Sequence, residues 1–147
     1  MEHEEYMRQA LELARLAMAE GEVPVGCVIV RDGAVVGRGR NRRETAQTAL
    51  GHAELEAIAQ ACRTLGGWRL AGCALYVTLE PCPMCAGAIV NARIPAVYYG
   101  AKDDKAGCCG SVLNLFEERF NHHPRINGRV LEAECAALLQ EFFQSLR

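Results

Sequence analysis

The first forty residues change from a helical to a strand-like pattern of apolar positions. Between residues 4 and 19, apolar side chains recur at the three- and four-residue spacing of a helix, at Tyr6, Met7, Ala10, Leu13, Ala14 and Ala17. Gly21 is typical of a residue that ends such a helix. The runs VGCVIV (25–30) and AVVG (34–37) flank Arg31-Asp32-Gly33, a pattern that predicts a β-hairpin.

The rest of the chain alternates between helical and strand-like segments. The Ala- and Glu-rich stretch 52–65 predicts a helix that Gly66-Gly67 ends, and the continuous apolar run ALYVTL (74–79) predicts a buried strand. Pro95 is expected to follow the end of another helix. Beyond residue 80, the pattern predicts helices over 85–93, 111–118 and 133–146, and strands over 96–100 and 129–131.

The order of these elements favours an α/β fold with helices on both faces of one sheet. Alternation of strand, helix and strand in the middle implies parallel pairing with a right-handed crossover, whereas the hairpin adds an antiparallel pair. The sheet is therefore expected to be mixed and roughly five-stranded. The sequence contains no repeat, linker or low-complexity tract, so residues 1–147 are expected to form a single domain.

Composition narrows the class of protein. Of the 147 residues, 50% are hydrophobic and 23% are charged, which is a globular balance that needs no disulfides. The net charge of −2 excludes a surface that coats a polyanion, so any nucleic-acid site must be local. The acidic start MEHEEYMRQ is unlike a signal peptide, and no apolar run is long enough to span a membrane. We therefore expect a soluble cytoplasmic protein whose eight cysteines are thiols or metal ligands.

Two short motifs indicate a metal site. In the motif Pro81-Cys82-Pro83-Met84-Cys85, two cysteines separated by two residues can hold one tetrahedral zinc ion, and Pro83 suits the first position of a helix. The positive end of that helix favours thiolates. His52 would be the third ligand, which leaves a fourth position open for water, as in catalytic zinc sites.

Glu54 is the residue that suggests catalysis at this metal. Residues two apart on a regular helix do not face each other, so His52 must lie at the edge of its helix if both side chains reach the site. Zinc lowers the pKa of a bound water molecule from about 15.7 toward about 7. A carboxylate beside that water can act as its general base and pass the proton to a substrate.

Each motif has a simpler interpretation when taken alone. A single Cys-x-x-Cys pair often holds a structural zinc, and a single His-x-Glu often has no function. Together they are more specific, because Cys82 follows Glu54 by 28 residues and no second Cys-x-x-Cys pair exists to complete a four-cysteine site. The combination therefore favours catalytic over structural zinc.

These motifs resemble the cytidine-deaminase-like superfamily, and nearly the whole chain is similar to the bacterial tRNA adenosine deaminases. The resemblance is carried by EVPVGCVIV (22–30), GRGRN (37–41), GHAELEAI (51–58), VTLEPCPMCAGAIVNARI (77–94), YYGAKDDKAGCCGS (98–111), NHHPRING (121–128) and ECAALLQEFF (134–143). It implies a three-layer α/β/α cytidine-deaminase-like fold and a hydrolase that converts the wobble adenosine of tRNA to inosine. It also implies one zinc ion per subunit, a homodimer, and binding of the tRNA anticodon arm near the subunit boundary.

The family's site residues carry over to matching positions of this sequence. The resemblance implies zinc ligands at His52, Cys82 and Cys85. It makes Glu54 the proton shuttle and Asn41 the residue that hydrogen-bonds the target base. Asp103 would lie near the target ribose, and Val25 in the segment that lines the base pocket. The chain departs from the family at Gly51, where Ala or Thr is common, and at Cys108-Cys109.

Several weaker signals have two interpretations each. Arg38, Arg40 and Arg42 would share one strand face, either toward RNA phosphates or as the solvated charges of an edge strand, and Gly37 and Gly39 would leave room for a ligand. A second basic cluster would face RNA or form a solvated loop, and contains His122, His123, Arg125 and Arg129. The apolar run 84–90 indicates a core helix or an oligomer contact. Phe142-Phe143 would stack on a base or, for at least one ring, pack in the core.

Two other functions stay open at this point. A deaminase of free guanine or cytosine would share the metal site but need no basic surface. An RNA-binding module with a structural zinc would bind RNA without releasing ammonia, although an open fourth ligand position and Glu54 argue against it.

Overall fold

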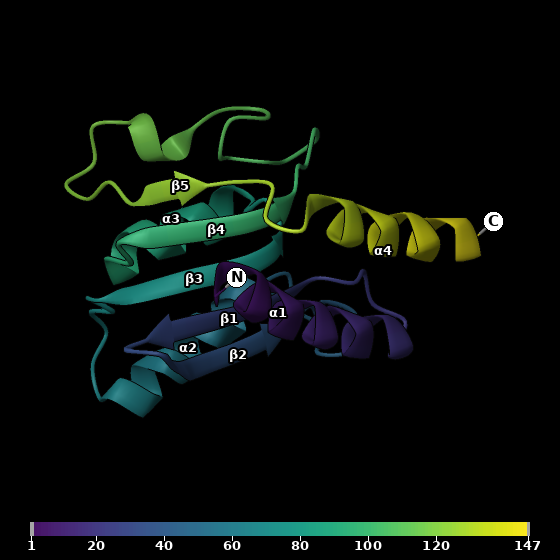
Figure 1. Cartoon of the computed structure of the whole chain (residues 1–147), viewed down its shortest axis with the longest axis horizontal. Helices are drawn as coiled ribbons and strands as arrows, with labels where there is room; N and C mark the ends of the chain where they lie inside the picture. The colour runs from purple at the N-terminus through teal and green to yellow at the C-terminus, as the bar shows by residue number, and fades with distance from the viewer. Residues whose placement is uncertain (1, 147) are drawn as a thin grey trace.

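A computed structural model describes residues 2–146, which form one mixed five-stranded sheet in the order β2-β1-β3-β4-β5 (Figure 1). The strands are β1 (Gly26–Arg31), β2 (Ala34–Arg40), β3 (Cys73–Leu79), β4 (Ala96–Ala101) and β5 (Arg125–Asn127). Strand β1 pairs antiparallel with β2 and β3, whereas β3, β4 and β5 are parallel. The mixed sheet predicted from the sequence is confirmed.

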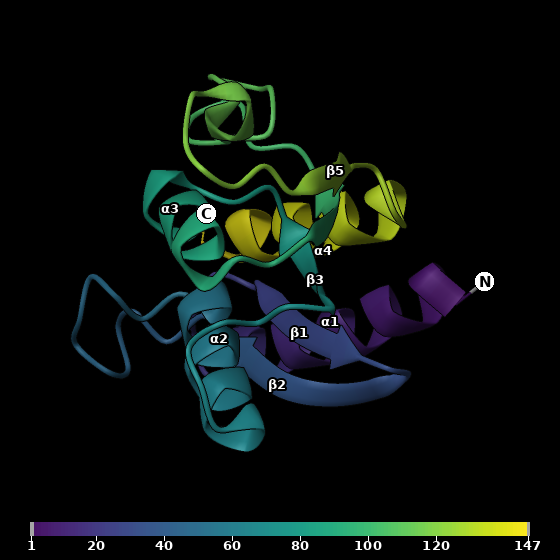
Figure 2. The same cartoon turned by 90° about the vertical axis from the view of Figure 1, so that its left-hand side faces the viewer.

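Four helices cover the two faces of the sheet (Figures 1 and 2). They are α1 (Glu2–Ala19), α2 (Ala53–Leu65), α3 (Pro83–Ala92) and α4 (Glu132–Ser145). The side chains of β1 divide the core, because Cys27 and Ile29 pack with α2 and α3, whereas Val28 and Val30 pack with α1 and α4. This alternation along one strand produces the expected three layers. No helix within residues 2–146 combines the length and the apolar character that crossing a membrane requires.

The hairpin between β1 and β2 forms at the predicted turn. Asp32 and Gly33 have φ angles of 51° and 77°. Positive φ at both central residues is the requirement of a tight two-residue hairpin turn, and Asp-Gly is among the sequences that meet it best. The hydrogen-bonded pairing continues past the strand, because the amide of Asn41 donates to the carbonyl of Val25 at 3.0 Å. This last pair brings both residues to the end of the sheet where the pocket lies.

The glycines of β2 serve helix packing, so the expectation that they leave room for a ligand is wrong. A Cβ atom on Gly39 would lie 2.1 Å from the carbonyl oxygen of Ala53, and one on Gly37 would lie 2.3 Å from that of Ala57. Helix α2 therefore occupies this space. The arginines of β2 fit the other interpretation, that of a charged edge strand. The Nε atom of Arg40 lies 2.9 Å from a carboxylate oxygen of Glu20, and β2 is at the edge of the sheet.

Two predictions for the C-terminal third are wrong. Residues 111–118 contain only a 3₁₀ turn at Leu115–Glu117, and the last strand is β5 rather than 129–131. Arg129 and Leu131 have φ angles of 68° and 52°, which a strand does not allow. Both errors arise because local apolar spacing does not reveal where the backbone amides of a long loop find their partners.

The structure shows how the apolar run of α3 and the Phe142-Phe143 pair of α4 are packed. Helix α3 buries Cys85, Ala86, Ile89 and Val90 against the sheet. In α4, Phe142 is buried and Phe143 is half exposed, so the prediction of a core role for at least one of the two is confirmed.

Candidate active site and metal centre

The metal-binding motifs lie at the beginnings of two helices. His52 is the N-cap residue of α2, with φ −95° and ψ 148°, and Cys82 is the N-cap residue of α3, with Pro83 directly after it. His52 therefore has extended rather than helical backbone. This is the geometry that the sequence predicted, because His52 and Glu54 could not both face the metal from a regular helix. Two helix N-termini meet at this point, and their positive ends favour anionic ligands.

The three candidate ligands converge on one point. The Nδ1 atom of His52 lies 3.6 Å from the Sγ atom of Cys82 and 3.6 Å from the Sγ atom of Cys85. The ligand atoms of the three residues all lie within 4.8 Å of one another. Tetrahedral zinc with Zn–S of about 2.3 Å and Zn–N of about 2.05 Å places sulfur and nitrogen about 3.6 Å apart. The donor set and its spacing therefore fit zinc.

The electrostatics of Cys82 favour a metal-binding thiolate. The pKa of Cys82 is lowered to about 4, chiefly by a hydrogen bond from the Cys85 side chain, against the effect of burial and with help from His52. Zinc binds cysteine as the thiolate, so a site that already stabilises the anion is prepared for the ion.

Glu54 is a buried carboxylate beside these ligands. Its side chain is only 4% exposed, in the first turn of α2. Burial raises the pKa of Glu54 to about 7, an effect to which the Cys82 thiolate adds and which His52 opposes. A carboxyl group with a pKa near neutrality can both take and give a proton at physiological pH. This is the property expected of a proton shuttle.

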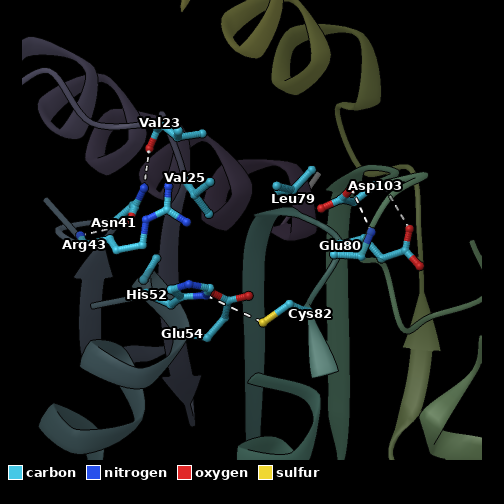
Figure 3. Close-up of a pocket in the computed structure, with 12 residues that line it drawn as sticks. Val23, Val25, Asn41, Arg43, His52, Glu54, Leu79, Glu80, Cys82 and Asp103 are labelled. Carbon is cyan, nitrogen blue, oxygen red and sulfur yellow. Dashed lines mark hydrogen bonds between the residues drawn. The ribbon is translucent and has the colours of Figure 1, made fainter. Parts of the chain in front are cut away.

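His52, Glu54 and Cys82 form the floor of a pocket of about 220 Å³ (Figure 3). One wall carries Val23, Val25, Asn41 and Arg43, and the opposite wall carries Leu79, Glu80 and Asp103. The volume is below the roughly 300–1,000 Å³ typical of sites for drug-sized ligands, and suits one heterocyclic ring system. The structure therefore brings Val25, Asn41 and Asp103, the positions that the family resemblance implies, into one pocket with His52 and Glu54.

Asn41 keeps hydrogen-bonding capacity for a ligand. It is 9% exposed, its amide nitrogen donates to the carbonyl of Val23 at 3.2 Å, and its Oδ1 accepts from the amide of Arg43 at 3.2 Å. A primary amide has two N–H donors and two acceptor positions, so one of each remains. Asn41 can thus keep its hydrogen bonds to Val23 and Arg43 and still form hydrogen bonds with an edge of a base.

Comparisons with known proteins identify the family of this chain. A model of the MafB19-like deaminase family matches residues 1–147. The tRNA-specific adenosine deaminase of Bacillus subtilis (strain 168) is 51% identical over 143 residues, which cover 97% of this chain and 89% of that protein. This chain belongs to the tRNA-specific adenosine deaminases.

Solved structures place this deaminase among relatives with the same fold. A structure from a study of A-to-I editing by tRNA:A34 deaminases is 44% identical, with a TM-score of 0.87, and the match covers 91% of this chain and 98% of that one. A guanine deaminase from Bacillus subtilis is 34% identical, with a TM-score of 0.68, over 98% of this chain and 95% of that one. The cytidine-deaminase-like fold expected from the sequence is confirmed.

The sequence did not reveal every residue that shapes the site of this deaminase. Val23, Arg43, Leu79 and Ala106 line the pocket without having been singled out, although each lies within three residues of a predicted one. The larger omission is Glu80, a carboxylate only 2% exposed. A charge directly after the apolar strand ALYVTL was the signal that could have found it.

Other predicted residues lie outside the pocket. His122 and His123 contact backbone carbonyls, at Ile94 (2.7 Å) and Glu118 (2.8 Å), and neither belongs to the metal cluster. Cys108 is buried, and Cys109 is half buried, with its amide bonded to Glu80 at 2.8 Å. The amide of Cys108 donates to the carbonyl of Pro81 at 2.9 Å, beside the ligand Cys82, but neither Cys108 nor Cys109 belongs to the metal cluster.

Proposed function

We propose that this deaminase hydrolyses adenosine to inosine at the wobble position of tRNA, with residues 1–147 acting as one catalytic domain. The observation that carries the proposal is the placement of Glu54 beside three zinc-type ligands at the floor of a base-sized pocket. The sequence similarity to tRNA-specific adenosine deaminases supports adenosine in tRNA as the substrate.

His52, Cys82 and Cys85 would hold one zinc ion per subunit through one imidazole nitrogen and two sulfurs. When bound, zinc supplies Lewis acidity that makes a water molecule acidic enough to ionise near neutral pH. Two thiolates and one neutral imidazole balance the charge of the ion. A site with three protein ligands would leave the ion able to bind solvent, as in catalytic zinc sites.

Glu54 moves the protons of the reaction. Hydrolysis adds a hydroxyl group to C6 of adenine and releases the amino group as ammonia. The Glu54 carboxylate takes the first proton from the attacking water and gives it to N1 of the base. Glu54 then takes the remaining proton from the hydroxyl group on C6 and delivers it to the amino group, so that ammonia leaves and C6 becomes the carbonyl carbon of inosine. Its pKa of about 7 suits both directions of transfer.

The two walls of the pocket would bind and orient the nucleoside. Asn41 offers its remaining donor and acceptor to the edge of the base, and the apolar side chain of Val25 contacts the ring. Asp103 lies on the opposite wall, where its carboxylate would accept a hydrogen bond from the ribose. An adenosine in an RNA loop must turn out of its stack to reach this depth.

The remaining parts of the proposal concern the setting of the enzyme. The anticodon arm would contact basic side chains near the pocket, including Arg43, because the net charge of −2 requires a local site. We infer a homodimer from the family resemblance. The exposed apolar residues Val112, Leu113 and Phe120 lie on either side, in the sequence, of the 3₁₀ turn that contacts α3, and they are suited to such an interface. None of the eight cysteines, all within residues 2–146, forms a disulfide, and we infer a reducing cytoplasm.

Sequencing of tRNA after reaction tests the activity. The zinc-loaded protein should convert the first anticodon adenosine to inosine, which reads as A-to-G, and should release ammonia. The Glu54→Ala variant should keep its zinc and lose both signals. Normal turnover in that variant would exclude Glu54 from the mechanism. RNA binding without ammonia release by the wild type would instead indicate a catalytically silent module.

A free-base deaminase is the second candidate, because a guanine deaminase shares the fold at 34% identity. Incubation with guanine, with cytosine and with an anticodon stem-loop separates the two activities. We expect ammonia release from the stem-loop alone. Turnover of guanine or cytosine without turnover of the stem-loop would favour the second candidate.

A further inference from the structure

Two buried carboxylates lie outside the predicted catalytic set: Glu80 lines the pocket, and Glu22 precedes Val23, which lines the opposite wall. Glu22 and Glu80 are each only 2% exposed. Burial of a carboxylate is costly unless it is compensated, so their partners indicate what they hold. Both accept hydrogen bonds from backbone amides of a loop that contributes residues to the pocket.

Glu80 accepts four hydrogen bonds from the loop that follows β4. Its Oε1 atom accepts from the amide of Asp103 at 3.0 Å and from the hydroxyl of Ser111. Its Oε2 atom accepts from the amides of Cys109 at 2.8 Å and Ser111 at 3.1 Å. The loop thus surrounds the Glu80 carboxylate. The first residue of the loop to donate a hydrogen bond to it is Asp103, through its backbone amide (Figure 3).

The packing of this loop leaves little freedom for Glu80. A Cβ atom on Gly107 would lie 2.3 Å from the Glu80 carboxyl carbon, so only glycine permits this approach. The side chain of Asp103 is held as well, because its Oδ1 accepts from the amides of Lys105 at 3.0 Å and Ala106 at 3.2 Å. The second oxygen of Asp103 is left for a ligand.

We propose that Glu80 is a positioning residue, which fixes the backbone of Asp103 and thereby the wall of the pocket that faces the ribose. This inference rests on the proposed function, because it assigns Glu80 a role in binding the same nucleoside. Glu80 itself does not take part in proton transfer. Its effect on the reaction passes through the placement of Asp103.

The hydrogen bonds require a carboxylate rather than an amide. All four partners of Glu80 are donors, and a glutamine there would turn an NH₂ group toward two of them. Glu80→Gln therefore keeps the size of the side chain but breaks the hold on the loop. Displacement of a binding group by about 1 Å can lower the rate about 100-fold.

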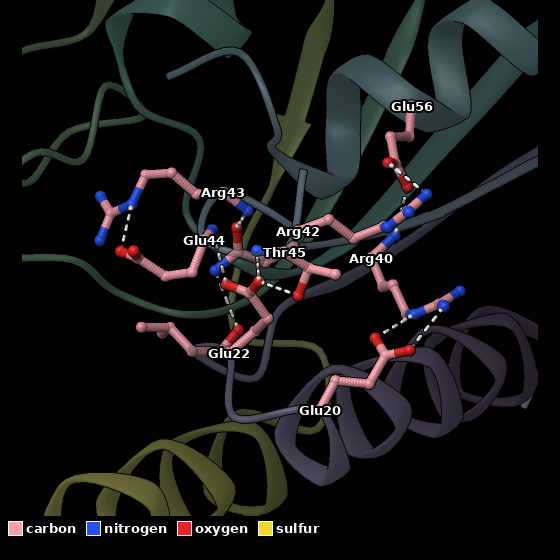
Figure 4. A network of polar contacts seen from close by, with 10 residues as sticks. Glu20, Glu22, Arg40, Arg42, Arg43, Glu44, Thr45 and Glu56 are labelled. Atoms are coloured by element: carbon pink, nitrogen blue, oxygen red, sulfur yellow. Dashed lines mark hydrogen bonds and ion pairs between the residues drawn. The ribbon is translucent and has the colours of Figure 1, made fainter. Parts of the chain in front are cut away.

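Glu22 provides a matched control, because it holds the loop that carries Arg43 on the opposite wall. It accepts from the amides of Thr45 at 2.6 Å and Glu44 at 3.2 Å, and from the hydroxyl of Thr45 (Figure 4). Its loop carries Arg43, and no residue of the Asp103 loop contacts its carboxylate among the hydrogen bonds of residues 2–146. Glu22→Gln thus makes the same chemical change without touching Asp103.

A double-mutant cycle tests the proposal with the zinc-loaded enzyme and an anticodon stem-loop. We expect Glu80→Gln and Asp103→Ala each to lower kcat/KM about 10-fold to 100-fold, mainly by raising KM. The double variant should be within about 3-fold of Asp103→Ala alone, because residues in one network are not additive. Glu22→Gln combined with Asp103→Ala should give the product of the single effects.

Ser111→Ala provides a second test if Glu80→Gln folds poorly. This variant removes the hydroxyl that donates one of the four hydrogen bonds to Glu80, and it leaves the negative charge of Glu80 in place. We expect a smaller rise in KM that also disappears in the Asp103→Ala background. Multiplicative effects of Asp103→Ala with both Glu80→Gln and Ser111→Ala, in an enzyme whose wild type forms inosine, would overturn this inference alone. A wild type that forms no inosine would overturn the proposed function and this inference with it.

Discussion

The Nδ1 atom of His52 lies 3.6 Å from the Sγ atom of Cys82, although 30 residues separate the two in the chain. Each residue caps a different helix, and β3 lies between those helices in the sequence. The fold therefore forms the metal site by bringing two helix N-termini together. Loss of one ligand should affect the ion directly and leave the sheet in place.

We predict that Cys82→Ser weakens zinc binding more than about 100-fold, because changes outside the ligand shell alone cost about 10-fold to 100-fold. Inosine formation should be lost with the metal. Zinc content per chain, measured by atomic emission, and tRNA sequencing check the two effects. Cys62→Ser is the control, since the Cys62 sulfur faces the carbonyl of Trp68 at 3.8 Å. Equal zinc content in Cys82→Ser and wild type would contradict the assignment.

The metal site was predictable because its signals are local. Pro83 after Cys82 indicates a helix start, and the spacing from His52 to Glu54 demanded an irregular backbone at His52. The loop of residues 102–114 was not predictable in this way. Its amides bond to Glu80, which lies 23 to 31 positions earlier, and no apolar periodicity records such a partner. The helix expected over 111–118 failed for this reason.

Asn41→Ala should lower kcat/KM about 10-fold to 100-fold and leave the zinc content unchanged. The variant loses the group expected to bind the base, together with the bonds to Val23 and Arg43, and each unmade buried hydrogen bond costs about 1–3 kcal/mol. Steady-state kinetics with an anticodon stem-loop measure the effect. The exposed Asn127 serves as the control position for the same substitution. Unchanged kinetics would remove Asn41 from substrate binding.

Gly39→Ala should destabilise the fold, because its Cβ atom would lie 2.1 Å from the backbone oxygen of Ala53 in α2. Overpacking costs about 1–3 kcal/mol or more, which corresponds to a fall of roughly 5 °C in the melting temperature of a domain this size. Gly67→Ala is the control, since no atom lies within 4 Å of its Cβ position, and it should be neutral or slightly stabilising. Calorimetry distinguishes them, and equal melting temperatures would argue against close α2 packing.

The contribution of Glu22 to stability should depend on pH in a defined direction. Burial raises the pKa of Glu22, but hydrogen bonds from Thr45 and Glu44 and the charge of Arg43 outweigh it, so the net pKa lies below 4.5. A carboxyl group with a depressed pKa in the folded state stabilises the protein above its unfolded pKa. That stability is lost as the pH falls through the folded pKa.

Urea denaturation of the wild type and Glu22→Gln at pH 7, 5 and 3 tests this direction. We expect the variant to be less stable by about 1–3 kcal/mol at pH 7 and pH 5, because glutamine presents a donor to the donors of Thr45. The gap should narrow as the pH falls from 5 to 3, because the wild type loses stability as the pH approaches the depressed pKa of Glu22, whereas the variant has no group to titrate at this position. Zinc release at low pH affects both proteins and cancels in the difference. A gap of the same size at pH 3 and pH 7 would mean that the charge of Glu22 does not hold the loop.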